Sequence, residues 1–171
     1  MGGLVILFNY EEAKKRVELP IHEVISKYRI PPPIILKEHE SIEHLINTLF
    51  RYGRECVLVS DNRGKVTGII TLFDLLKLFI EHPRSRLILR HPRLRPENER
   101  SPISTVMSPN PIKIGKDLKL RDVLELMVRY GVSHVVVIEP KTKEPIAVLS
   151  KRIILRELLG VEILRDLTTA V

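Results

Sequence analysis

A short stretch with the sequence GIITLFD, at residues 68–74, places a hydroxyl and a carboxylate three positions apart. Apolar residues precede Thr71 and an apolar helical pattern follows Asp74, so we expect both side chains at a junction between a strand and a helix. Two interpretations are open there. Thr71 can cap the helix with Asp74 in its first turn, or both side chains can bind a polar ligand beside the helix start. Gly68 allows a neighbour or a ligand to approach the backbone closely.

Side chains elsewhere in the chain do not form a comparable catalytic or metal-binding group. The stretch HESIEH separates His39 and His44 by five positions, which is about 140° around a helix, whereas the zinc motif of this type requires a separation of four. Cys56 opens an apolar strand pattern and fits a small core residue. No nucleophile elbow, phosphate-binding glycine loop or dinucleotide fingerprint occurs. The sequence therefore predicts a protein without a metal site and without catalysis.

An internal repeat is expected to position the residues around Asp74. The tripeptide Arg-Tyr-Gly occurs at 51–53 and again 78 positions later at 129–131. The apolar residues before each copy have the spacing of an amphipathic helix, and a β-branched run follows each copy. The next turn is one residue longer in the second copy, so GIITLFD then aligns with AVLSKRI at 147–153. The pattern indicates one structural unit that is written twice.

Each copy is expected to contain a strand, a helix, two strands joined by a turn, and a final helix, which is an α+β arrangement. The expected strands lie near 34–37, 56–60 and 66–71 in the first copy and near 112–115, 134–139 and 145–150 in the second. The expected helices lie near 41–52, 72–81, 119–130 and 151–159. Gly53 and Gly131 occupy the position that often ends a helix with a left-handed residue.

The segment before each copy is also repeated, because LPIHEVIS at 19–26 resembles SPISTVMS at 101–108. The expected organisation is an N-terminal extension 1–18, a first unit 19–80, a basic connector 81–100, a second unit 101–159 and a C-terminal extension 160–171. The connector contains six arginines and three glutamates. It could bind nucleic acid or ligand phosphates, or it could be a solvated linker. It contains no aromatic side chain on which single-stranded bases could stack.

The repeat and its motifs resemble the tandem CBS-domain pair (cystathionine-β-synthase domains), also called a Bateman module. The stretch GIITLFD fits the family's Gly-h-h-Thr-x-x-Asp motif, in which h is apolar. The stretch VMSPNPIKI at 106–114 is similar to the family's Val-Met-Thr-x-x-Pro start. The resemblance covers roughly residues 19–159. It implies two β-α-β-β-α units packed as a pseudo-two-fold pair, an adenosine-containing ligand in the cleft between the units, and a homodimer.

The resemblance also implies roles for individual residues. Asp74 would accept hydrogen bonds from both ribose hydroxyls, and bonds to a charged acceptor are about twice as strong as neutral ones. Thr71 would orient the sugar or contact phosphate. The implied adenine and phosphate contacts are Pro32, Pro33, Ile34, Arg54, Gly68 and Ile70. Core packing would equally explain the apolar members of this set, and Arg54 could be an ordinary exposed charge.

The second copy departs from the family motif, because Ile153 stands where the carboxylate is expected. Ser150 keeps a hydroxyl that can cap the following helix. We therefore expect one strong site and a second site that is weak or altered. The candidate residues of the second site are Pro111, His134, Ser150, Lys151 and Arg152. His134 could instead be a core histidine, and the two basic residues could form an exposed first turn.

The composition is compatible with a regulatory protein that binds an anion. The net charge of +7 favours phosphates, nucleotides or nucleic acid as partners. A single cysteine excludes an internal disulfide and indicates a reducing, cytoplasmic location. The apolar run from Leu4 to Phe8 is too short for a signal peptide or a membrane span. The absence of Gln, with 29% charged residues, favours a thermophilic source.

We therefore expect a non-catalytic energy sensor that binds AMP in preference to ADP or ATP, without a prosthetic group. S-adenosylmethionine is the alternative ligand. The expected assembly is a homodimer that acts on a protein partner which the sequence does not identify. Two other functions are open: a nucleic-acid-binding protein that uses the connector, and a structural subunit with vestigial nucleotide sites.

Overall fold

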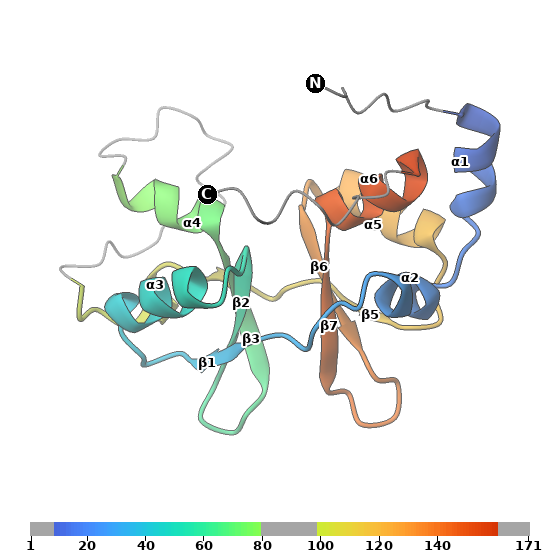
Figure 1. Cartoon of the computed structure of the whole chain (residues 1–171). Helices are drawn as coiled ribbons and strands as arrows, with labels where there is room; N and C mark the ends of the chain where they lie inside the picture. Colours follow the sequence, from blue (N-terminus) through green and yellow to red (C-terminus); the bar gives the residue numbers. More distant parts are fainter. Residues whose placement is uncertain (1–8, 80–98, 161–171) are drawn as a thin grey trace. The chain divides into compact units, whose positions relative to one another are not determined.

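The computed structural model describes residues 9–79 and 99–160, and these form two compact units (Figure 1). Residues 33–111 form the first-repeat unit. Residues 1–32 together with 112–171 form the second-repeat unit. Nearly all of the basic connector and all of the C-terminal extension after Gly160 lie outside the described residues.

The first-repeat unit is a four-stranded sheet, in the order β1-β2-β3-β4, with helices packed against it. Strand β1 is parallel to β2, and the other two pairings are antiparallel. Apolar side chains from α3, the central strands and the segment around Ile103 form its core. The elements in chain order are β1 (Ile35–Lys37), α3 (Ile42–Arg51), β2 (Cys56–Ser60), β3 (Val66–Thr71), α4 (Leu72–Leu76), the 3-10 turn η1 (Lys77–Phe79), the 3-10 turn η3 (Ile103–Thr105) and β4 (Ser108–Pro109).

The second-repeat unit is a three-stranded sheet, in the order β5-β6-β7, with its own apolar core. Strand β5 is parallel to β6, and β6 is antiparallel to β7. Figure 1 shows α1 beside α6 in this unit. The elements in chain order are α1 (Tyr10–Arg16), α2 (Ile21–Lys27), β5 (Lys113–Gly115), α5 (Leu120–Tyr130), β6 (His134–Ile138), β7 (Pro145–Ser150) and α6 (Lys151–Leu159).

Strand register confirms the repeat at the level of single residues. Leu58 is paired with Ile35 in one unit, and Val136 is paired with Lys113 in the other, at the same offset of 78. Both hairpins also have a register shift at matching places, between Val59 and Ser60 and between Val137 and Ile138. The expected elements agree closely with the structure, except for the helix expected near 72–81. It is α-helical as α4 only to Leu76 and continues as η1 to Phe79, and residues 80 and 81 lie outside the described residues.

Glycine ends the first helix of each copy, as expected. Gly53 and Gly131 have φ angles of 56° and 63°, a left-handed conformation that residues with a Cβ rarely adopt. The chain then turns directly into the central strand of each sheet, which places the β-branched run in the core. Glycine at these two positions therefore permits the sharp turn from helix to strand in both units.

The leading segment of each sequence repeat packs on the other repeat. The backbone N–H of Ile21, in α2, donates to the carbonyl of Leu118 at 2.9 Å, which joins α2 to the start of α5. In the matching contact, the N–H of Ile103 donates to the carbonyl of Glu40 at 2.8 Å, beside the start of α3. Both isoleucines are fully buried in the cores that they join. The units in space thus differ from the sequence repeats, because the leading segments are exchanged.

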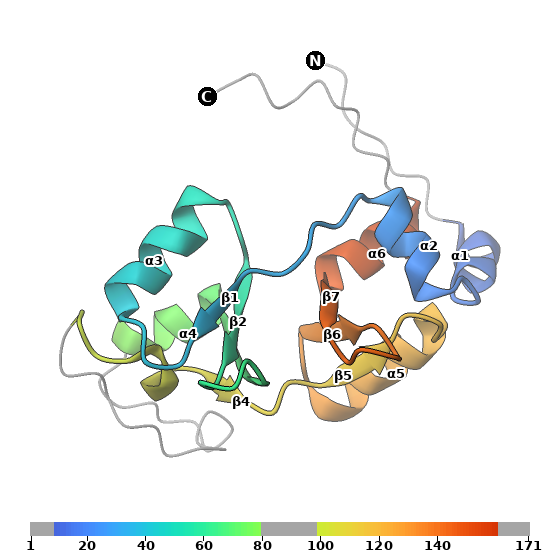
Figure 2. The same cartoon turned by 90° about the horizontal axis from the view of Figure 1, so that it is seen from below.

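This exchange brings residues 106–109 to the edge of the first sheet, where β4 is hydrogen-bonded to β3. Figure 2 shows β4 beside the other strands of this sheet. Gly68, in β3, is paired with Pro109, and a Cβ at Gly68 would overlap the sulfur of Met107. The glycine therefore makes room for the leading segment of the other repeat. Its buried position beside that segment also explains how Ser108 reaches the end of β3.

Candidate functional site

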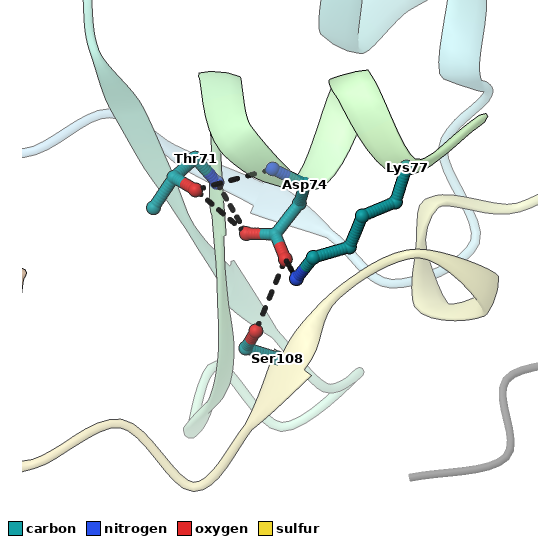
Figure 3. Close-up of polar contacts among 4 residues, drawn as sticks. All are labelled: Thr71, Asp74, Lys77 and Ser108. Atoms are coloured by element: carbon teal, nitrogen blue, oxygen red, sulfur yellow. Dashed lines mark hydrogen bonds and ion pairs between the residues drawn. The ribbon is translucent and has the colours of Figure 1, made fainter. Parts of the chain in front are cut away.

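Thr71 and Asp74 form a reciprocal cap at the start of α4 (Figure 3). Thr71 is extended, so its side chain turns back over the first turn of the helix. The backbone N–H of Asp74 donates to Thr71 Oγ1 at 3.3 Å, while the backbone N–H and the hydroxyl of Thr71 donate to Asp74 Oδ2 at 2.9 and 2.8 Å. The capping interpretation of the motif is therefore correct.

The second carboxylate oxygen of Asp74 has donors from two other places. Lys77 Nζ lies 2.8 Å from Asp74 Oδ1, and the hydroxyl of Ser108 donates to the same oxygen at 3.2 Å. Asp74 is 3% exposed, whereas the side chain of Lys77 is 27% exposed. Figure 3 shows the carboxylate between β3, α4 and the strand that carries Ser108.

These donors keep Asp74 ionised in spite of its burial. Burial by itself would raise the pKa of the carboxyl group, but the hydrogen bonds from Lys77 and Thr71 outweigh it and hold the pKa below its usual value. A buried carboxylate that remains ionised is a strong acceptor. The arrangement can bind hydroxyl groups of a ligand if some of the present donors leave.

The other residues predicted near this site lie at its margins. Pro33, Ile34 and Arg54 are half-buried, and Pro32 is exposed. Ile70 is fully buried in the core of the first-repeat unit, so it supports the end of β3 from within. It stays a prediction that a ligand site is lined by Pro32, Pro33, Ile34, Arg54, Gly68 and Ile70.

The corresponding position in the second-repeat unit holds a cap without a carboxylate. Ser150 precedes α6, and its Oγ accepts the backbone N–H of Ile153 at 3.5 Å. Ile153 packs against the core of this unit instead of turning back to the cap. His134 is paired with Ser150 across β6 and β7. Lys151 and Arg152 are exposed in the first turn of α6, and Pro111 is half-buried two residues before β5. A ligand site made by these residues stays a prediction.

Glu157 is a buried carboxylate that the sequence did not single out. It lies one turn after Ile153 on α6 and is 2% exposed. Lys27 Nζ and the hydroxyl of Tyr28 donate to its Oε2 at 2.7 and 2.8 Å. Burial and the hydrogen bond with Glu157 raise the pKa of Tyr28 to about 12, so this hydroxyl remains a donor at neutral pH.

Glu157 and Asp74 share one structural role, because each carboxylate binds the exchanged leading segment of the other repeat. Lys27 ends α2 and Tyr28 follows it, and Ser108 lies near the end of the other leading segment, after η3. The alignment of LPIHEVIS with SPISTVMS showed that the leading segment is repeated, but Lys27 and Tyr28 lie just beyond it, and it did not link Ser108 to Asp74. It gave no information on the acid, because Glu157 has no acidic counterpart in the first copy.

The remaining sequence candidates do not form a further site in the described part of the chain. His44 Nε2 lies 3.0 Å from Glu40 Oε2, and residues 9–79 and 99–160 contain no group of three side chains suited to a metal ion. Burial raises the pKa of the Cys56 thiol to about 12, which makes it unreactive at neutral pH. Among the helices in these ranges, none has the length and apolarity needed to cross a membrane.

Similarity to solved structures agrees with this architecture. A CBS-domain-containing protein ATU1752 from Agrobacterium tumefaciens has a TM-score of 0.64 at 18% identity, with 82% of this chain and 94% of that chain covered. The CBS-domain pair of MJ0100, in complex with 5′-methylthioadenosine and S-adenosyl-L-methionine, has a TM-score of 0.61 at 20% identity, with 83% and 97% covered. CBSX2 in complex with AMP has a TM-score of 0.58 at 15% identity, with 82% and 96% covered.

Family membership follows from the sequence. No curated protein sequence matches this chain. The family model named CBS domain matches it twice, at residues 22–81 and 103–160, which together make up more than half of its length. These two segments coincide with the two copies of the repeat. The chain therefore belongs to the CBS-domain family, as a tandem CBS-domain pair.

Proposed function

We propose that this chain is a non-catalytic regulatory module that binds an adenine nucleotide, with AMP preferred over ADP and ATP. The single observation that carries the proposal is the buried carboxylate of Asp74 beside Thr71, within an intact family motif. The solved CBS structures that contain AMP, 5′-methylthioadenosine and S-adenosyl-L-methionine support the ligand class, because all three ligands contain adenosine.

In this proposal the two ribose hydroxyls donate to the Asp74 carboxylate. Thr71 keeps the carboxylate in place, since its own N–H and hydroxyl both donate to Oδ2. Arg54, at the end of the loop after α3, supplies positive charge for the phosphate, and Ile34 and Pro33 contact the adenine ring. Regulation follows if the ligand binds one arrangement of the protein more tightly than another, since only such a difference shifts a population.

AMP is expected to raise the melting temperature of the protein. A ligand at 100 times its dissociation constant stabilises the folded state by about 2.7 kcal/mol, which corresponds to roughly 5–10 °C for a protein of this size. Thermal unfolding would be followed with AMP, ADP, ATP, adenosine and S-adenosylmethionine in the millimolar range, with inorganic phosphate as the control. If none of the adenosine compounds changes the melting temperature beyond the phosphate control, the proposed function is wrong.

We also propose that the module is a homodimer. Four large apolar side chains on α4 and η1 are exposed, by 40% to 83%, which is unusual for a face that meets only water. They are Leu72, Phe73, Leu76 and Phe79. A second copy of the chain would bury them.

Light scattering is therefore expected to give twice the mass of the chain, and Phe79→Glu is expected to give a folded monomer. Val128→Glu is the matched control, because Val128 is equally exposed but lies on α5. A wild-type mass equal to one chain, independent of concentration, would rule out the dimer. A dimer that Val128→Glu dissociates and Phe79→Glu leaves intact would move the interface away from α4 and η1.

A further inference from the structure

The carboxylate of Asp74 has no acceptor position left for a ligand in the described structure. Two oxygens of a carboxylate accept about four hydrogen bonds in total. Oδ2 accepts two from Thr71, and Oδ1 accepts one from Lys77 and one from Ser108 (Figure 3). A ribose diol that binds Asp74 must therefore replace donors that are already present.

Among the donors in the described part of the chain, Lys77 is best able to leave. The two donors from Thr71 belong to the reciprocal cap of α4, so their removal would also break the helix start. The ammonium group of Lys77 lies at the end of a flexible stem, three residues after Asp74, and the Lys77 side chain is 27% exposed, against 3% for Asp74. Its ammonium group can turn to water, where it is well hydrated.

The second repeat indicates that the fold does not require the ion pair between Lys77 and Asp74. The equivalent of Lys77 is Arg156, at the offset of 79 that also relates Asp74 to Ile153. Arg156 lies over the ring of Tyr28, 4.8 Å from its centre, and Ile153 offers it no carboxylate. The helix thus forms in both units, but the ion pair at this position occurs only where the acid is present.

We propose that Lys77 is an internal competitor of the ligand, which occupies the Asp74 carboxylate in the empty site and is displaced by the two hydroxyls of a cis-diol. This inference rests on the proposed function of the Asp74 site. It gives Lys77 two opposite effects. The lysine stabilises the empty protein by compensating a buried charge. It also lowers the affinity for the ligand, because the ion pair between Lys77 and Asp74 must be broken before the ligand binds.

Removal of Lys77 is expected to tighten the binding of adenosine about tenfold, the size of effect expected from one charge-assisted hydrogen bond. Adenosine is the decisive probe, because it has the ribose diol but no phosphate that a lysine could attract. Lys77→Met and Lys77→Gln would be compared with wild type by calorimetric titration at about pH 8, where the carboxylate is ionised. Lys77→Gln keeps a neutral donor and serves if Lys77→Met does not fold.

Two controls separate competition from a general effect of charge. Lys65→Met removes the same charge from an exposed turn between β2 and β3, and is expected to leave the affinity for adenosine unchanged. The ligand 2′,3′-dideoxyadenosine lacks both hydroxyls, and its binding is expected to show no gain in either Lys77 variant. Both Lys77 variants are also expected to melt at a lower temperature than wild type in the absence of ligand.

The outcomes distinguish this inference from the proposed function. If wild type binds adenosine or AMP but neither Lys77 variant binds adenosine more tightly, Lys77 is not a competitor and the proposed function stands. If the variants gain affinity for dideoxyadenosine as well, the gain does not come from the diol and the inference is overturned. If neither wild type nor variants bind any adenosine compound, the proposed function fails and the inference fails with it. Measurable binding by the variants alone supports both.

Discussion

Ile21→Ala is expected to destabilise the second-repeat unit, although Ile21 belongs to the first sequence repeat. Its side chain is fully buried in the core formed with Leu120 and Val123. Truncation of a buried isoleucine to alanine costs about 2–5 kcal/mol, because apolar contacts are lost and a cavity remains. Ile103→Ala is the matched variant, since Ile103 is fully buried in the core of the first-repeat unit.

Hydrogen exchange measured residue by residue tests this crossed dependence. In Ile21→Ala, the amides of β6 are expected to lose protection more than those of β2, and in Ile103→Ala the order is expected to reverse. Amides in central strands report the stability of the core around them. The exchange of leading segments would be wrong if each variant loosened its own sequence repeat, so that Ile21→Ala affected β2 and left β6 protected.

The elements of the fold could be predicted because periodicity is a local property. Helical spacing before Gly53 and Gly131, and β-branched runs after them, were sufficient to place α3, β2, α5 and β6. The turn of one extra residue in the second copy could also be read directly. Helix α4 ended earlier than predicted, since an apolar pattern does not reveal where α-helical hydrogen bonding changes to a 3-10 turn.

The exchange of leading segments could not be predicted, because a pattern of apolar residues reveals which side chains are buried and not against which partner. Ile21 and Ile103 occupy equivalent positions in the aligned segments LPIHEVIS and SPISTVMS. A buried isoleucine at either position fits a contact inside its own copy as well as a contact with the other copy. The choice depends on backbone bonds to Leu118 and Glu40, residues far away in the sequence.

The same limit applies to the candidate site. The spacing of Thr71 and Asp74 predicted the cap, since that interaction spans three residues. Ser108 was out of reach of such reasoning because 34 positions separate it from Asp74. Glu157 was missed for a related reason: its donors Lys27 and Tyr28 come from the opposite end of the chain, so the helical pattern of α6 contained no sign of them.

Asp74→Asn is expected to weaken the binding of AMP about 10- to 100-fold. The substitution removes the charge from the acceptor of the ribose hydroxyls, and charge-assisted hydrogen bonds contribute about 1.5–3 kcal/mol. The amide oxygen of asparagine can still accept the backbone N–H of Thr71, so the cap of α4 is retained. The amide nitrogen would face Lys77 or Ser108, and we expect a loss of stability of about 1–3 kcal/mol, limited because Lys77 can turn to solvent.

Ile153→Ala is the matched control for this loss of stability. Ile153 occupies the position of Asp74 in the second copy and packs against the core of the second-repeat unit. Its truncation is expected to cost about 1–2 kcal/mol, since the side chain is only partly buried. The substitution should not change the affinity of the Asp74 site for AMP, because it alters no acceptor for the ribose.

Calorimetric titration of AMP into the two variants and wild type, well below their melting temperatures, separates binding from stability. If Asp74→Asn binds AMP as tightly as wild type, the carboxylate only caps α4 and compensates Lys77, and the ribose site lies elsewhere. If both variants bind AMP more weakly by the same factor, the loss of affinity follows from general destabilisation. A large loss confined to Asp74→Asn would assign the ribose contact to this carboxylate, since the two variants have a similar cost in stability and differ in the acceptor that is removed.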